Sequence, residues 1–259
     1  MALANFNKKD ETEVVFAKPV NTSKTLAKTF GYMAIALVVT AAVALGLGAL
    51  FAYLLFPDYS FGGETFNTTA FTAYIVVMIV SLLALIIDSI AMRMVFAKGK
   101  HSIWPHYLIF AALMGVFLSS FLVLGVDFGV IAEAAGISAL VFGILFLIGY
   151  FSKKDLNPLA FAAWGLLCMV GLFGILFFVL FLIIPGAYLF YNLIYCGVFA
   201  LVMLISVATD CFNAKKMLEN GQANDNLALY CAYMMYTDFI MIFFRVLYLL
   251  ALISGDKKK

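Results

Sequence analysis

The chain alternates between long apolar runs and short polar segments. A helix needs about 20 apolar residues to cross the roughly 30 Å hydrocarbon core of a bilayer. Seven runs are long enough, at about 30–56, 71–96, 105–125, 128–151, 157–184, 187–211 and 227–253. The pattern predicts an all-α fold, a polytopic membrane bundle of seven transmembrane helices over residues 30–253. A polar N-tail (1–29) and a basic C-terminal tail (254–259) flank it.

The composition agrees with a membrane protein and argues against several other classes. The chain is 66% hydrophobic and 12% charged, whereas soluble domains carry roughly 25% charged residues. The four cysteines show no spacing typical of a disulfide framework or a zinc site. A net charge of +2 gives no reason to expect nucleic acid as a partner. Because the chain has no phosphate loop, HExxH or nucleophile elbow, we expect neither an enzyme nor a cofactor.

The distribution of basic residues predicts the orientation. Lys and Arg cluster in the N-tail and in the loops after the second, fourth and sixth runs, and the other three loops have none. Cytoplasmic loops carry this excess, so we expect a cytoplasmic N-terminus. Seven spans then place the tail 257–259 outside, against the rule. Either the last helix spans despite this tail, which its long unbroken run favours, or it re-enters and returns.

The membrane in which the chain lies is a separate question. The first apolar run is long enough to span and follows a charged segment, so we expect it to remain as the first helix. The short loops and the lack of an obvious retention signal favour a bacterial plasma membrane over an internal membrane such as the endoplasmic reticulum. Glycines recur in the first, fourth and fifth runs, where small residues let membrane helices approach closely. They are Gly46, Gly48, Gly136, Gly143, Gly149, Gly165, Gly171 and Gly174.

Two aspartates in otherwise apolar runs are the strongest functional signal. Asp238 lies about 11 residues into the last helix, hence roughly 16 Å from its cytoplasmic end. Asp210 lies near the cytoplasmic end of the sixth helix, which we expect to continue to a C-cap at Gly221. A carboxylate inside a bilayer is costly and by default marks a functional site. Two close carboxylates do not both ionise readily and share a proton at intermediate pH. Structural hydrogen bonding is the alternative for Asp238, and snorkelling is the alternative for Asp210.

Other ionisable residues are weaker candidates. Arg93, at the cytoplasmic end of the second helix, is either a latch on the sixth-helix aspartate or an interfacial anchor. Asp88 is five positions away and not an i,i+4 partner, so it either lines an ion path or hydrogen-bonds locally. Glu133 either attracts cations at an outer mouth or reaches interfacial water. Arg245, two turns beyond the last-helix aspartate, either borders the ion path or snorkels outward or pairs with an exterior acid. His106 is predicted to be an interfacial anchor.

These residues also carry a resemblance to a known family. The segment Tyr236-Thr237-Asp238-Phe239-Ile240, followed by an apolar run with Arg245, resembles the C-terminal signature of the transmembrane Bax inhibitor motif family. Asp210, Arg93, the Glu133-Ala134-Ala135 stretch and the seven-helix layout fit the same pattern. The resemblance therefore extends over all seven helices. Thr237 departs from it, because leucine is usual before the aspartate, and Asp88 is not part of the pattern.

The resemblance implies a bundle with helix 7 central and a pH-sensitive calcium leak channel. Asp210 and Asp238 would be the proton sensor, with Arg93 as a latch on Asp210. The bilayer, protons and calcium, the transported ion, would be the partners. As oxygen ligands suited to a hard cation, the two aspartates are also candidates for transient calcium ligation. Two alternatives stay open: a non-transporting regulator that binds a membrane protease or cell-death factor through its N-tail, and a proton-coupled cation transporter.

Overall fold

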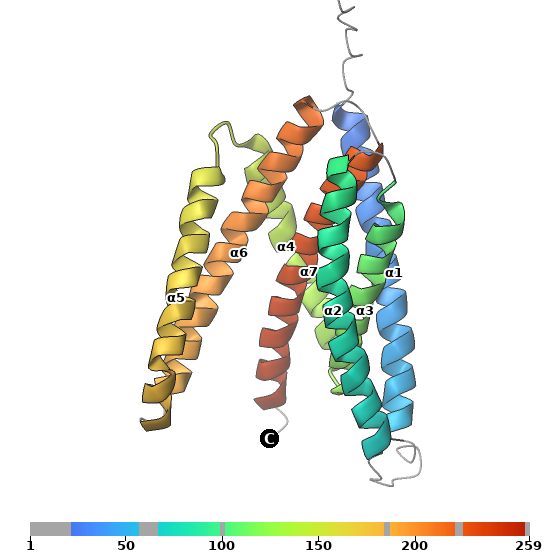
Figure 1. Ribbon diagram of the computed structural model, residues 1–259, viewed down its shortest axis with the longest axis vertical. Helices are drawn as coiled ribbons and strands as arrows, with labels where there is room; N and C mark the ends of the chain where they lie inside the picture. The colour runs from blue at the N-terminus through green and yellow to red at the C-terminus, as the bar shows by residue number, and fades with distance from the viewer. Residues whose placement is uncertain (1–21, 57–66, 99–101, 184–186, 221–224, 257–259) are drawn as a thin grey trace, which may run out of the picture.

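The structure is a computed structural model that describes residues 22–56, 67–98, 102–183, 187–220 and 225–256. These residues form helices and no strand (Figure 1). The helices are α1 (Thr22–Leu55), α2 (Thr68–Lys98), α3 (Trp104–Val123), α4 (Phe128–Phe151), α5 (Asn157–Ile183), α6 (Ala187–Asn220) and α7 (Asp225–Asp256). Each of the seven is long and apolar enough to cross a membrane, which confirms the predicted all-α polytopic fold.

Local sequence explains where several helices begin. The side-chain oxygen of Asn67 accepts hydrogen bonds at 3.1 Å from the backbone N–H groups of Thr69 and Ala70, and so caps α2. Pro105 falls in the first turn of α3, where its missing N–H costs no intrahelical bond. Gly125 has a φ of 73° in the turn between α3 and α4, a left-handed conformation that glycine adopts without strain.

Two helices extend into polar sequence beyond their apolar runs. α1 begins at Thr22, within the predicted N-tail, and α6 continues past Lys215 and Lys216 to Asn220. The extension of α6 agrees with the predicted continuation of that helix, although Gly221 itself lies outside the described residues. Residues 1–21 and 257–259 of the two predicted tails also lie outside them.

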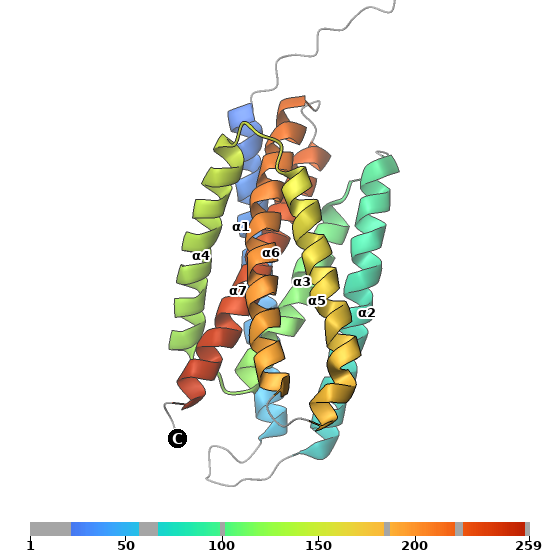
Figure 2. The same ribbon diagram turned by 90° about the vertical axis from the view of Figure 1, so that its left-hand side faces the viewer.

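The helices form two groups that α7 joins. α1 packs against α3 and α7, α2 against α3, and α5 against α6, while α4 contacts both α6 and α7. The α5–α6 pair leans away from α2 at the end opposite the N-terminus, and α7 lies between the two groups (Figure 1). α7 is one continuous helix, and a second view shows that it ends at the end of the bundle opposite the start of α1 (Figure 2). This course corresponds to the spanning alternative for the last helix.

The position of α7 inside the bundle is only partly as expected. α7 packs against α1, α3, α4 and α6, and the stacked rings of Phe96 and Tyr230, with centroids 4.1 Å apart, join it to α2. Its enclosure by all six other helices stays a prediction.

A polar junction fixes α7 against α1 and α3. The hydroxyl of Tyr236 lies 2.6 Å from that of Thr40, which is 2.9 Å from the carbonyl oxygen of Ala111. Both Thr40 and Tyr236 are buried. Buried hydroxyls that find partners add direction to an otherwise apolar contact. The junction therefore sets the rotation of α7 at a position two residues before Asp238.

Candidate functional site

Ion pairs lie at the end of the bundle where α1 begins, which we call the N-terminal end. Lys28 and Asp225 lie 2.8 Å apart and join the starts of α1 and α7. Lys216 and Asp155 lie 4.0 Å apart and join α6 to the segment before α5. All four side chains are exposed, and exposed pairs contribute little to stability. These pairs mark the polar rim of the bundle rather than its functional interior.

Asp210 and Asp238 lie within electrostatic reach of each other inside the bundle. Asp210 lies about 15 Å along α6 from Asn220, and Asp238 about 20 Å along α7 from Asp225, at 1.5 Å per residue. Asp238 is within electrostatic reach of Asp210, and both carboxyl groups act on Cys211. The Oδ2 atom of Asp238 is buried with no hydrogen-bond partner among the described residues. Similar depths on two helices in contact thus place both carboxyl groups in one region.

The threonines that precede the two aspartates donate their hydroxyl hydrogen bonds to the backbone of their own helices. Thr237 donates a hydrogen bond of 2.8 Å to the carbonyl oxygen of Tyr233, and Thr209 donates one of 2.8 Å to that of Ile205. Both bonds lie within the residue's own helix. The departure at Thr237 from the expected leucine therefore adds no free hydroxyl beside Asp238. The buried hydroxyl of Ser206, one turn before Asp210 on α6, has no hydrogen-bond partner among the described residues.

Arg93 brings a third helix to the same region. It lies on α2, is exposed, and interacts electrostatically with Asp210 and with Tyr233 of α7. The ion pairs within 4.0 Å formed by the described residues do not include Arg93. The cation therefore acts on Asp210 from beyond direct ion-pair contact. The structure brings together the three residues predicted as sensor and latch, and their roles stay predictions.

Asp88 belongs to a different contact. Its carboxylate is buried, and its Oδ1 lies 2.7 Å from Nδ1 of His106 on α3. The partner is thus on the neighbouring helix, rather than local as one alternative expected. His106, predicted to be an interfacial anchor, is therefore also the hydrogen-bond partner of a buried carboxylate. The antiparallel course of the two consecutive helices allows such a contact, but the sequence does not give the relative depth and rotation that the contact requires.

The other two candidates lie away from the aspartates. Glu133 is exposed near the start of α4, at the end of the bundle opposite the N-terminal end. Arg245 lies two turns beyond Asp238 on α7, where its guanidinium is 5.3 Å from the ring centre of Phe199. The ion pairs of the described residues do not include Arg245, so the expected exterior acid is not found there.

Comparison with known proteins places the chain in a family. The family described as Inhibitor of apoptosis-promoting Bax1 matches residues 22–255, a range that includes all seven helices but for the last residue of α7. The chain belongs to this family. An uncharacterized protein of Chlamydia muridarum (strain MoPn / Nigg) is 27% identical over 241 residues, covering 90% of this chain and 92% of that protein. No solved structure matches the chain.

Membership of the Bax inhibitor family confirms the resemblance. The chemistry of the site depends on the residues that its geometry brings together. The described residues contain no group of three or more His, Cys, Asp or Glu side chains that could hold a metal ion. Transient calcium ligation by Asp210 and Asp238 therefore stays a prediction. What the arrangement offers is two carboxyl groups within electrostatic reach of each other, with a cation on a third helix within electrostatic reach of Asp210.

Proposed function

We propose that this Bax inhibitor-like membrane protein is a pH-sensitive calcium leak channel gated by Asp210 and Asp238. The observation that carries the proposal is the convergence of two carboxyl groups from α6 and α7 inside an apolar bundle. Intramembrane carboxylates of this kind mark proton relays and ion paths. The unpartnered Oδ2 of Asp238 supports the proposal, because that atom is available to a proton or a cation.

The gate works through the number of protons that the pair holds. With one proton shared, the carboxyl groups attract each other and hold α6 against α7. When both ionise they repel, because like charges at close range in a poorly hydrated site interact strongly. Repulsion separates α6 from α7 and opens the path, so flux rises with pH. Arg93 opposes this opening by drawing α2 toward Asp210, which is the latch that we assign to it.

Calcium crosses as a transported ion and is not held as a resident one. A hard cation prefers carboxylate and carbonyl oxygens, which Asp210, Asp238 and an opened helix contact would supply. The lysine-rich N-terminal end of the bundle supports a cytoplasmic N-terminus, with the pair nearer to the cytoplasmic side. We place the protein in a bacterial plasma membrane on the shortness of its loops.

The test is calcium entry into dye-loaded liposomes that contain the purified full-length protein. Flux above that of empty liposomes that requires no proton gradient supports a leak. Asp210→Asn and Asp238→Asn should both lower this flux. Asp225→Asn is the matched control, because it removes an exposed carboxylate at the start of α7 and should leave flux unchanged.

The same experiment separates the alternatives. Calcium accumulation that requires an opposing proton gradient would identify a proton-coupled transporter. Protein that carries no flux at any pH would refute the leak and leave the non-transporting regulator. Deletion of residues 1–21 would then be expected to abolish the regulatory effect, whereas under the leak proposal the deletion spares flux.

A further inference from the structure

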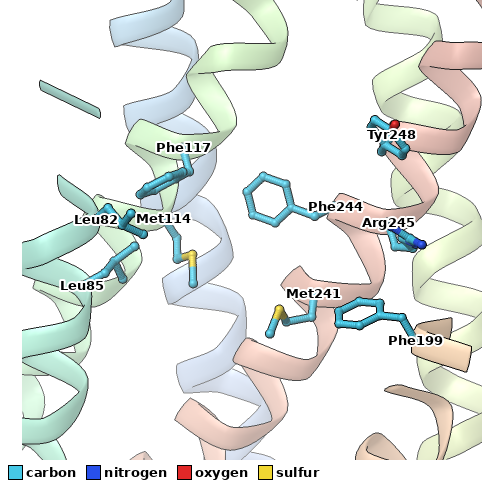
Figure 3. A pocket seen from close by; sticks show the side chains of 9 residues that line it. All are labelled: Leu82, Leu85, Met114, Phe117, Phe199, Met241, Phe244, Arg245 and Tyr248. Atoms are coloured by element: carbon cyan, nitrogen blue, oxygen red, sulfur yellow. The ribbon is translucent and has the colours of Figure 1, made fainter. Parts of the chain in front are cut away.

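A groove of about 390 Å³ opens between two pairs of helices in the half of the bundle away from the N-terminal end (Figure 3). One wall is formed by Leu82 and Leu85 of α2 with Met114 and Phe117 of α3. The other wall is formed by one face of α7, with Phe199 of α6 beside it. In this half of the bundle the α5–α6 pair leans away from α2 (Figure 1). Leu82 is exposed, so the groove is open toward the bilayer.

The groove is apolar except for one cation. Arg245 is the charged residue among those lining it, on the α7 stripe with Met241 and Tyr248. The Nη2 atom of Arg245 is buried with no hydrogen-bond partner among the described residues. The guanidinium carbon lies 5.3 Å from the centre of the Phe199 ring, a cation–π contact. Such a contact does not replace a hydrogen-bond acceptor for the N–H groups. A guanidinium carries five donors, and those on Nη2 are left without an acceptor among the described residues.

The depth of Arg245 suits a lipid headgroup. It lies about 12 Å along α7 from Ile253, where the apolar run ends. A long arginine side chain at such a depth reaches toward the interface, and lipid phosphates are drawn inward to meet it. Basic pockets between transmembrane helices bind anionic headgroups in this way.

We propose that this groove binds an anionic phospholipid, with its phosphate on Arg245, on the side of α7 that faces Phe199, and one acyl chain along the apolar lining of the groove. The acyl chain alone gives little preference, because lipid tails in the surrounding bilayer are as apolar as the groove. Selection comes from the charge. Arginine binds phosphate through two parallel hydrogen bonds, and the groove supplies no acidic side chain to compete. A lipid of net negative charge is therefore preferred over a zwitterionic one.

The test is competitive lipid retention by the delipidated full-length protein in detergent. The protein is incubated with equal amounts of phosphatidylglycerol and phosphatidylcholine, and the lipids that remain bound are counted by native mass spectrometry. Wild type should retain phosphatidylglycerol in excess by about tenfold, as expected for a charge-assisted contact. Arg245→Gln should remove the excess, and Arg245→Lys should keep part of it. Lys28→Gln is the control, because it removes an exposed cation at the N-terminal end and should behave as wild type.

A second variant guards against a folding defect in Arg245→Gln. Leu82→Trp adds bulk at an exposed position of the groove and leaves the cation in place, so it should lower total lipid retention. An excess that persists unchanged in Arg245→Gln overturns the proposal, as does wild-type protein with no excess. Oleate that displaces phosphatidylglycerol at equal concentration overturns the phospholipid assignment in favour of a free carboxylate. None of these readouts depends on calcium flux, so the proposed function stands or falls separately.

Discussion

Gly149 on α4 is the point at which α4 approaches α6 beside Asp210. A methyl group built at this position would overlap the carbonyl oxygen of Ala208 and lie 2.9 Å from the Cβ atom of Cys211. One of these neighbours belongs to the backbone, which cannot rotate out of the way as a side chain can. The substitution Gly149→Ala therefore forces α6 away from α4 at the residue that adjoins Asp210.

The expected cost follows from this overlap. Forcing an additional methylene group into a well-packed contact costs about 1–3 kcal/mol. For folded domains of 150–250 residues, each kcal/mol lowers the melting temperature by about 2–4 °C. We therefore expect Gly149→Ala to melt about 2–12 °C below wild type in the same detergent. The assay is thermal unfolding of the purified full-length protein followed by far-ultraviolet circular dichroism.

A matched control lies on the same helix. A methyl group at Gly143 meets nothing within 4 Å, so Gly143→Ala tests the loss of a glycine without the overlap. It should melt at or slightly above the wild-type temperature, since alanine favours the helix by up to about 1 kcal/mol. If both variants fall equally, or if Gly149→Ala melts as wild type does, the close α4–α6 contact is not what stabilises this region.

Three further substitutions test other contacts of the bundle. Tyr236→Phe removes a hydroxyl bonded to Thr40 and should lower the free energy of unfolding by about 0.5–1.5 kcal/mol, measured by chemical denaturation in detergent. His106→Gln replaces the partner of the buried Asp88 carboxylate and should cost about 1–3 kcal/mol in the same assay, a loss that Asp88→Asn should relieve in the double variant. Arg93→Gln should raise calcium flux at neutral pH several-fold if Arg93 is a latch, and an unchanged flux would leave it as an anchor.

The helices could be predicted because the signal for each is local. An apolar run of sufficient length specifies a spanning helix whatever it packs against. Asp210 and Asp238 could be identified as candidates for a similar reason, since a carboxylate in an apolar run is conspicuous in any fold. Their positions along the two helices were compatible with an interaction but could not establish one. Whether the side chains approach each other depends on the tilt and rotation of α6 and α7.

Other features depend on which faces meet and were beyond the sequence. Gly143 and Gly149 lie in the same apolar run, yet an added methyl group would contact α6 only at Gly149. The pairing of Asp88 with His106 requires the relative depth of α2 and α3, which no local pattern contains. Arg245 has no acidic partner among the described residues, and the ring of Phe199 lies beside its guanidinium instead, a contact that depends on how α6 and α7 pack.

The pH dependence of calcium flux in Asp238→Asn tests the gating proposal most directly. Flux is measured in proteoliposomes from pH 5 to 8, with the same pH inside and outside so that no proton gradient contributes. Wild-type flux should rise with pH as the second proton leaves the pair. An asparagine at position 238 cannot ionise, so the variant should give a low and flat profile. A variant whose flux rises with pH along the wild-type curve would contradict gating by this pair.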